Sequence, residues 1–532
     1  MTIMIQSNYI YGQGIINSNL KLFFTPKKLS PADYTIDVSL DIENNTYTGV
    51  ETIVWQNESQ LPINRFCIDR GIIATNDLTI EEINGTPPDE RQLLFHNRLI
   101  LIDLPAPIVC GGQFTIKAKF SAQLPKSDYH EGDIFEFDSE IAWYPKLYWD
   151  EPTGNTYKVT FGNVTDGYQV FAAGEKTGNT YSEYNIANYY GFAVSKIMTS
   201  ISAEVRGIAV TIVHYPKYRE FAEFMLETAT DALDFFIDFI GFYPYKSFTV
   251  IPGSQKWYGG YIFSGGIVYV HNFESYDPNN QKFMDYFKAI VPHEIGHQYF
   301  WEYVIENESP GWLGLGLSMA LDREYSQHKA GAKSFYKSLI DDYLEYVDTG
   351  KNTTITLSEE DARRALNDED NEYGSDYNSH IRHGKSFSIM SMLIDIIGKD
   401  RFFNIMRHIL NTHGGKPLYT PDFINICEEF SGISLNWFFV QWLKSNKSMS
   451  CSMGNITERG TDGAYTVTVD VCRNDSIAAP VCVAAYFEDG SSQTIFTERL
   501  LSKQKLIFTA KSKCTKIIFN PFETYAMAKS HA

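Results

Sequence analysis

Residues 291–304 read VPHEIGHQYFWEYV, and the rest of the chain is best interpreted outward from them. His293 and His297 stand four positions apart, with Glu294 between them. In a helix, positions i and i+4 lie on one face, so both imidazoles are able to bind the same metal ion. Neutral imidazoles suit Zn²⁺, and catalytic zinc sites keep one position open for water. The spacing therefore predicts one Zn²⁺ ion held by His293 and His297, with Glu294 as general base.

The composition describes a folded, acidic chain of several domains. Its 532 residues exceed one ordinary hydrophobic core, and 44% of them are hydrophobic, which is ample for packed domains. The net charge of −20 argues against the phosphate backbone of a nucleic acid as a partner. An acidic surface that is simply solvated has the same composition, so the charge alone identifies no ligand.

The cysteine content and the hydrophobic runs indicate the cellular compartment in which the protein is expected. Seven cysteines are scattered without a CxxC spacing, which indicates neither a disulfide framework nor a cysteine zinc site. The first residues, MTIMIQSNYIYGQG, lack the basic and apolar regions of a secretory signal. No uncharged apolar run approaches the ~18 residues that cross a bilayer. These features predict a cytoplasmic protein without a membrane partner.

The periodicity of apolar residues divides the chain into three parts. Residues 1–205 show alternating strands, such as Ile36 to Ile42, separated by turn residues. Residues 206–447 are mainly helical, with apolar residues at helical spacing from Phe221 to Ile240. Residues 448–532 return to short strands. The predicted fold class is α+β multidomain, with an N-terminal antiparallel β domain, a mainly helical middle domain and a C-terminal β-sandwich.

This order of domains around a His-Glu-x-x-His helix resembles the M1 family of zinc metallopeptidases, whose founding activity is aminopeptidase. Gly260–Val270 takes the place of the family's substrate-binding glycine motif, and Trp312–Leu317 resembles its Trp-Leu-x-Glu-Gly segment. Gly384–Gly398 resembles the helix that follows. The last β module resembles that of bacterial relatives without the long helical C-terminal domain. The resemblance implies a thermolysin-like catalytic domain, one Zn²⁺ ion and a peptide or protein substrate.

Carried across residue by residue, the resemblance assigns the roles of metal ligand and general base to three residues. His293 and His297 are metal ligands, and Glu294 is the general base. Substrate binding falls to the glycine motif, and catalytic stabilisation of the oxyanion falls to the nearest tyrosine. The residues concerned are Gly260, Phe263, Gly266 and Tyr377.

The chain departs from the family pattern at the third zinc ligand. Leu315 stands where the family has a glutamate, and the alternative register places Gly316 there. Asp322 follows roughly 10 Å further along a helix that rises about 1.5 Å per residue. Glu306 and Glu308 precede this helix in a loop and remain candidates. Since catalytic sites normally have three protein ligands, the zinc is expected to be weakly held.

Two further departures concern the substrate. Phe263 stands where aminopeptidases of the family have the glutamate that binds the free amine, so recognition of the substrate end is expected to be altered. Ile381 stands at the position of the family's catalytic tyrosine, and Tyr377 and His380 are alternatives for that role. Pro292 also lies in the metal helix, where a proline either kinks the helix or begins a new one.

Three hypotheses follow. The first is a zinc metallopeptidase with altered recognition of the substrate end, supported by the intact His-Glu-x-x-His pattern. The second is a catalytically impaired scaffold that binds peptides or proteins, supported by the three departures. The third is a metal hydrolase with a different substrate and the same activation of water.

Overall fold

The structure is a computed structural model, and the part of the chain that it describes forms two compact units. The first unit contains the residues up to 306 together with Glu324–His328 and Ile409–Leu418, and the second contains the remainder. The described residues are 30–125, 134–137, 141–148, 152–253, 259–271, 273, 277–306, 311–329, 333–350, 352–355, 377–461, 463–473 and 477–521.

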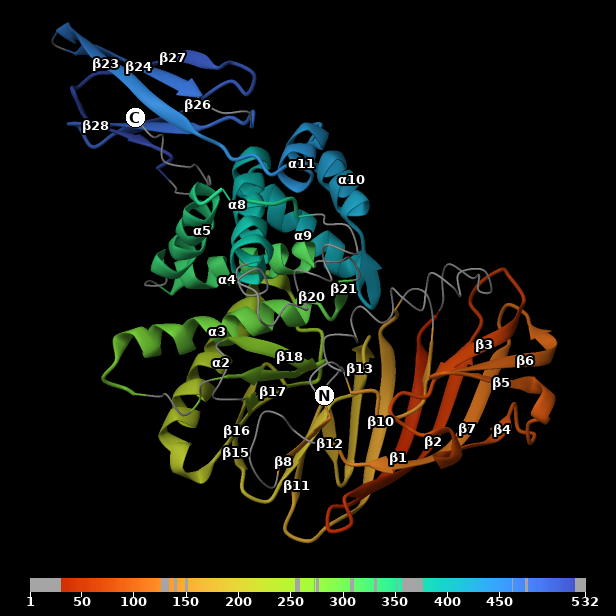
Figure 1. Ribbon diagram of the computed structural model, residues 1–532. Helices are drawn as coiled ribbons and strands as arrows, with labels where there is room; N and C mark the ends of the chain where they lie inside the picture. The colour runs from red at the N-terminus through yellow and green to blue at the C-terminus, as the bar shows by residue number, and fades with distance from the viewer. Residues whose placement is uncertain are drawn as a thin grey trace. The chain divides into compact units, whose positions relative to one another are not determined.

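A seven-stranded sheet dominates the N-terminal part of the first unit, in the order β12-β13-β10-β1-β2-β7-β4 (Figure 1). The prediction of a β-rich N-terminal region is confirmed, but a purely antiparallel domain is wrong, because β1 and β10 are parallel, with Ile36 opposite Val159. The long connection between these two strands makes a parallel pairing possible. The strands are β1 (Ala32–Asp41), β2 (Thr46–Gln56), β4 (Leu78–Ile83), β7 (Gln113–Gln123), β10 (Asn155–Val164), β12 (Glu175–Thr177) and β13 (Thr180–Ile186).

Alternation along the strands builds the core of this region. On β1, Ile36, Val38 and Leu40 are buried while Asp33 and Asp37 face solvent, as the period of two requires. Two smaller sheets, β5-β6-β3-β9 and β11-β14-β8, contribute to the same apolar cluster. Their strands are β3 (Ile63–Asp69), β5 (Leu93–His96), β6 (Leu99–Ile108), β8 (Ile134–Phe137), β9 (Lys146–Leu147), β11 (Gln169–Ala172) and β14 (Phe192–Ser195).

A five-stranded mixed sheet follows, in the order β15-β16-β17-β19-β18. Strands β16, β17 and β19 are parallel, and β18 lies antiparallel to β19 at one edge. Strands β15 and β16 form a hairpin that spans the domain boundary expected at residue 205. The strands are β15 (Thr199–Val205), β16 (Ile208–His214), β17 (Ser247–Pro252), β18 (Gly260–Ser264) and β19 (Ile267–Val270).

Two helices pack beside this sheet: α2 (Arg219–Ile240) and α3 (Gln281–Tyr299) (Figure 1). Helix α3 begins after Asn280, whose side chain accepts a hydrogen bond from the backbone N–H of Lys282 at 3.2 Å. Pro292 lies inside α3, and the helix does not restart there. From Ala289 to Tyr299 every residue is buried, so packing on all sides compensates for the hydrogen bond that the proline removes. Three short parallel strands complete this unit: β20 (Phe300–Trp301), β21 (Val304–Glu306) and β22 (Lys416–Leu418).

The second unit begins with helices. Its π-helical segment, η6, runs directly into α8, and every residue of α8 from Ser386 to Ile394 is buried. Helix α8 corresponds to the segment Gly384–Gly398 that resembles a helix of the family. The helical elements are α4 (Trp312–His328), α5 (Lys333–Asp348), η6 (Tyr377–Lys385), α8 (Ser386–Ile397), α9 (Lys399–His413), α10 (Thr420–Ser431) and α11 (Asn436–Leu443), of which α4 and α9 extend into the first unit.

The C-terminal module consists of two three-stranded sheets, β23-β24-β27 and β26-β25-β28. Apolar residues from both sheets, including Val469, Val483 and Phe508, share one buried cluster. Among the described residues, no helix has the length and hydrophobicity to cross a membrane. The strands are β23 (Cys451–Thr461), β24 (Ala464–Arg473), β25 (Cys482–Phe487), β26 (Ser492–Phe496), β27 (Lys503–Ala510) and β28 (Cys514–Phe519).

Candidate active site

The two histidines of α3 converge. The Nε2 atom of His293 lies 3.0 Å from the Nε2 atom of His297, and the two rings are nearly perpendicular, at 83°. Both side chains are almost buried, with 9% and 7% of their surface exposed. The spacing of four residues therefore has the consequence expected from the sequence, because the two ring nitrogens face one point.

The distance between the two nitrogens tests whether the pair fits a metal ion. Nitrogens bound at about 2.05 Å to a tetrahedral Zn²⁺ lie about 3.3 Å apart, close to the 3.0 Å observed between His293 and His297. The pair thus fits two positions of such a site. Within the described residues, however, no three His, Cys, Asp or Glu side chains form a group able to hold a metal.

The candidates for a third ligand have other environments. Leu315 is buried in α4, and a side chain at Gly316 would meet the side chain of Met390, whose Cγ lies 2.8 Å from the position of an added Cβ. Asp322 is fully buried further along the same helix, and Glu306 is half-buried at the end of β21. Glu308 lies outside the described residues.

The glycine strand lies against the proposed base. A Cβ atom added to Gly260 would fall 2.2 Å from Oε1 and 2.5 Å from Cδ of Glu294, so only glycine leaves room for the carboxylate. Glu294 is 2% exposed, and Gly260 is half-buried at the start of edge strand β18. The structure therefore brings Gly260 of the glycine motif together with His293, Glu294 and His297 of the histidine motif, two segments that the sequence analysis selected separately.

Phe263 has a different environment. It lies at a bulge in the pairing of β18 with β19, and bulges redirect side chains. Its ring is fully buried, packs edge-on against Tyr269 at 4.6 Å and approaches Gly191 of the N-terminal region. A side chain without exposed surface contacts no substrate unless the strand rearranges.

Two residues that the sequence analysis did not assign hold the β18–β19 hairpin to α3. The backbone N–H of Gly266, a residue with φ +78°, donates to Oε1 of Gln298 at 2.8 Å. At the other end, the hydroxyl of Tyr286 accepts from the N–H of Gly259 at 2.6 Å and donates to its carbonyl at 3.1 Å. A signal existed for Tyr286, because it precedes His293 by seven residues, two helical turns on the same face.

The tyrosine candidate begins the π-helical segment. Tyr377 is the first residue of η6, and its side chain lies outside what the structure describes. His380 stacks on the ring of Tyr346 at 4.7 Å, and Ile381 is fully buried. π-Helical turns are frequent at functional sites, although this does not assign a role to any one residue.

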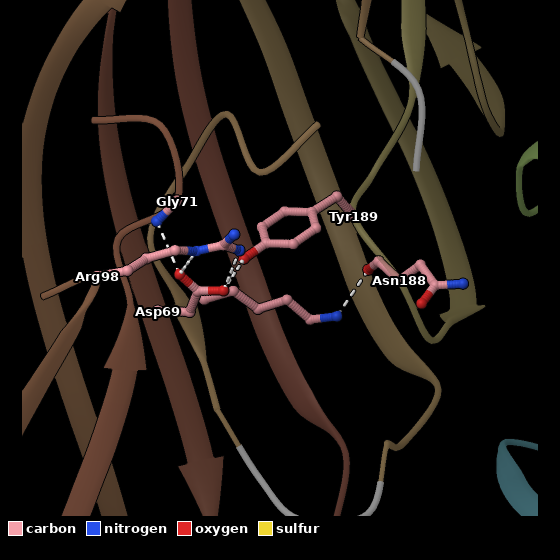
Figure 2. A network of polar contacts seen from close by, with 6 residues as sticks. Asp69, Gly71, Arg98, Asn188 and Tyr189 are labelled. Carbon is pink, nitrogen blue, oxygen red and sulfur yellow. Dashed lines mark hydrogen bonds and ion pairs between the residues drawn. The ribbon is translucent and has the colours of Figure 1, made fainter. Parts of the chain in front are cut away.

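A polar network of the N-terminal region reaches the residues that follow α3. Glu302, whose N–H donates to the carbonyl of His297, accepts a hydrogen bond from the amide of Asn188 at 3.1 Å. The ammonium of Lys146 donates to the carbonyl of Asn188 at 2.8 Å and lies over the ring of Tyr189 (Figure 2). Burial raises the pKa of Glu302 and lowers the pKa of Lys146 to about 8. The end of the histidine helix is thus attached to the β domain.

A His-Glu-x-x-His helix with converging imidazoles, beside an edge strand whose glycine faces the glutamate, is the arrangement typical of a metallopeptidase. Residues 224–442 match the model of the peptidase family M1 domain. The chain is also similar to Aminopeptidase N of Acetobacter pasteurianus, with 22% identity over 306 residues, which cover 52% of this chain and 84% of the relative. Residues 224–442 thus resemble a peptidase domain of family M1, which confirms the resemblance drawn from the motifs for this part of the chain.

Proposed function

We propose that this protein hydrolyses peptide bonds with a metal ion, Zn²⁺, held by His293 and His297. The observation that carries the proposal is the 3.0 Å separation of the two Nε2 atoms, together with a neighbouring carboxylate that faces the backbone of Gly260. The family match makes a peptide or protein the expected substrate. The thermolysin-like domain, the two boundaries between the three domains and the cytoplasmic location stay predictions.

Each residue has a defined task in this proposal. A bound Zn²⁺ would supply a Lewis acid that polarises the scissile carbonyl. Glu294 takes a proton from the attacking water and delivers it to the leaving amine. The start of β18, at half-buried Gly260 and exposed Tyr261, offers backbone groups to an extended peptide, which adds to the sheet edge. Tyr377 is retained as the candidate for stabilising the oxyanion.

We also propose altered recognition of the substrate end. Phe263 replaces the glutamate that the resemblance leads one to expect, and its ring is buried against Tyr269. It supplies no charge for a free amine, and the backbone N–H of Gly266 donates to Gln298. Peptides blocked at the amino terminus should therefore be cleaved about as well as free peptides.

A second candidate function is a scaffold that binds peptides without cleaving them. One observation favours it: the described residues include no third metal ligand beside the two histidines. In that case β18 would still bind an extended peptide, because binding by an edge strand requires only backbone hydrogen bonds.

One variant separates the two functions. Glu294→Gln keeps the shape of the side chain and removes its basicity, so hydrolysis of a peptide library should fall by about three orders of magnitude. Glu302→Gln is the matched control, because it neutralises a buried glutamate near the end of the same helix and should leave most activity intact. If wild type and Glu294→Gln both bind peptides and neither cleaves them, the scaffold is correct.

A further inference from the structure

Within the described residues, side chains of α3, the histidine helix, form hydrogen bonds with the backbone at two places of the β18–β19 hairpin, which we call the glycine hairpin. Tyr286 contacts Gly259, which precedes β18, and Gln298 contacts Gly266, which precedes β19. Gln298 is fully buried, and its amide group also lies 3.5 Å from the carbonyl of Ile267. Gly259 thus lies directly before the first strand of the hairpin, and Gly266 lies in the turn between its two strands.

The backbone at both points adopts conformations that ordinary residues avoid. Gly259 has φ +108° and Gly266 has φ +78°. The hydrogen bonds to Tyr286 and Gln298 therefore help to fix both glycines, together with the N–H of Thr249, which donates to the carbonyl of Gly266 at 2.8 Å. The carbonyl of Gly259 accepts a further hydrogen bond from the N–H of His271.

Glu294 and β18 lie so close together that the strand has little room to move toward the carboxylate. The carboxylate lies where a Cβ atom of residue 260 would be, so a displaced strand either collides with the base or moves away from it. We infer that Tyr286 and Gln298 are positioning residues, which fix the glycine hairpin so that a peptide on β18 presents its carbonyl to Glu294. This inference rests on the proposed function and deepens it.

The mechanism predicts a separation of kinetic effects. Glu294 acts in the transition state, whereas the backbone hydrogen bonds of β18 hold the substrate before and during reaction. A small displacement of the hairpin should therefore lower kcat more than it changes KM. A residue needed only for stability would instead reduce the amount of folded enzyme and leave both constants of the folded fraction unchanged.

The experiment compares Tyr286→Phe and Gln298→Met with Tyr299→Phe in the full chain. Tyr299 is the matched control, because its hydroxyl on the same helix donates to the carbonyl of Phe242 at 2.7 Å and not to the hairpin. Two quantities are measured: hydrogen exchange of residues 259–266 and the steady-state constants for a peptide substrate. Tyr286→Phe and Gln298→Met should each accelerate exchange and lower kcat by about tenfold, with KM changed less, and Tyr299→Phe should do neither.

Several results overturn the inference. Unchanged exchange in both variants means that the two side chains do not hold the hairpin. Faster exchange with an unchanged kcat means that the hairpin's position does not matter for reaction. If the wild type shows no hydrolysis that depends on Glu294, the proposed function fails instead, and the exchange measurements alone then decide whether the hairpin is held to α3.

Discussion

Two buried polar clusters of the first unit differ in how their charges are balanced. In the N-terminal domain, Asp69 forms a two-point ion pair with Arg98 and also accepts hydrogen bonds from the Tyr189 hydroxyl and the Gly71 N–H, both at 2.9 Å (Figure 2). In the helix, the imidazoles of His293 and His297 meet each other at 3.0 Å. In the first cluster, hydrogen-bond donors and acceptors are matched within the protein. In the second cluster, two imidazole nitrogens point toward each other.

This difference shows what each cluster is for. A buried carboxylate surrounded by a guanidinium, a hydroxyl and a backbone amide is stabilised by the fold itself. Two imidazole nitrogens that face each other have no comparable reason to converge, unless a shared ion or a shared proton lies between them. The first arrangement is structural, and the second fits either a hydrogen bond between the two rings or the shared metal ion proposed above.

The largest effect is expected from breaking the matched cluster. Arg98→Met leaves the Asp69 carboxylate buried without its guanidinium, and losing one partner of a buried pair costs about 3–5 kcal/mol. The variant should therefore unfold at clearly lower denaturant concentration than the wild type, monitored by tryptophan fluorescence. Arg65→Met is the matched control, because Arg65 pairs with Asp103 at an exposed site of the same sheet and should lose about 0–1 kcal/mol. Equal losses in the two variants would contradict the structural role of the buried pair.

The next effect concerns the glycine that faces the base. Gly260→Ala places a methyl group 2.2 Å from Oε1 of Glu294, and the carboxylate has to move. Because a displacement of about 1 Å at a reacting group costs about 100-fold in rate, kcat should fall by about that factor with a small change in stability. Gly162→Ala is the control: its Cβ would meet the nearest atom, Ser39 Oγ, at 3.7 Å. Full activity of Gly260→Ala would show that Glu294 does not need its present position.

Another buried acid, Glu51, sharpens the comparison with Asp69, because among the described residues no ion pair of Glu51 is seen. Within the described residues both carboxyl oxygens of Glu51 lack a hydrogen-bond partner, and burial raises the pKa of Glu51 well above its usual range. The folded state therefore keeps a proton that the unfolded chain releases. The contribution of this proton to the free energy of unfolding is fully present below the pKa of an exposed glutamate. Above that pKa, the free energy of unfolding falls by about 1.4 kcal/mol for each pH unit, up to the raised pKa.

Glu51→Gln should remove this pH dependence, because glutamine has no proton to lose. The measurement is the free energy of unfolding between pH 5 and pH 8 for both proteins, with Glu58→Gln, a change at an exposed glutamate, as the control. Parallel curves for wild type and Glu51→Gln would show that Glu51 is ionised in the folded protein.

Much of this arrangement was predictable from the sequence. The alternation from Ile36 to Leu40 predicted a strand and its buried face, and the spacing of His293 and His297 predicted that their rings meet. These features depend on local periodicity, which packing does not change. The parallel pairing of β1 with β10 was missed, because a pairing between distant segments leaves no local pattern.

The supporting residues of the site were harder to find. Gln298 and Tyr286 act through hydrogen bonds to glycine backbone atoms of another element. The spacing places Tyr286 on the same helix face as His293, but it does not indicate which glycines the two side chains contact. Phe263 is buried together with Ile262 and Ser264, beside a bulge in the pairing of β18 with β19, and burial on both faces of a strand depends on tertiary packing rather than on local pattern. Pro292 was expected to interrupt the helix, and burial of the surrounding residues overrides that local preference.

The smallest effect is expected from adding a third ligand to the pair of His293 and His297. Leu315→Glu restores the carboxylate that the resemblance places in α4, and a third ligand should raise zinc retention after mild chelation by about tenfold, or about 1.4 kcal/mol. Gly316→Glu tests the alternative register and should instead destabilise the protein, because its side chain meets Met390. Leu317→Glu is the control for adding a buried acid to the same helix and should retain no more zinc than the wild type. If Leu315→Glu and Leu317→Glu retain equal amounts of metal, residue 315 does not face the histidines, and the convergence of the two imidazoles needs an explanation other than a zinc site that lacks one carboxylate.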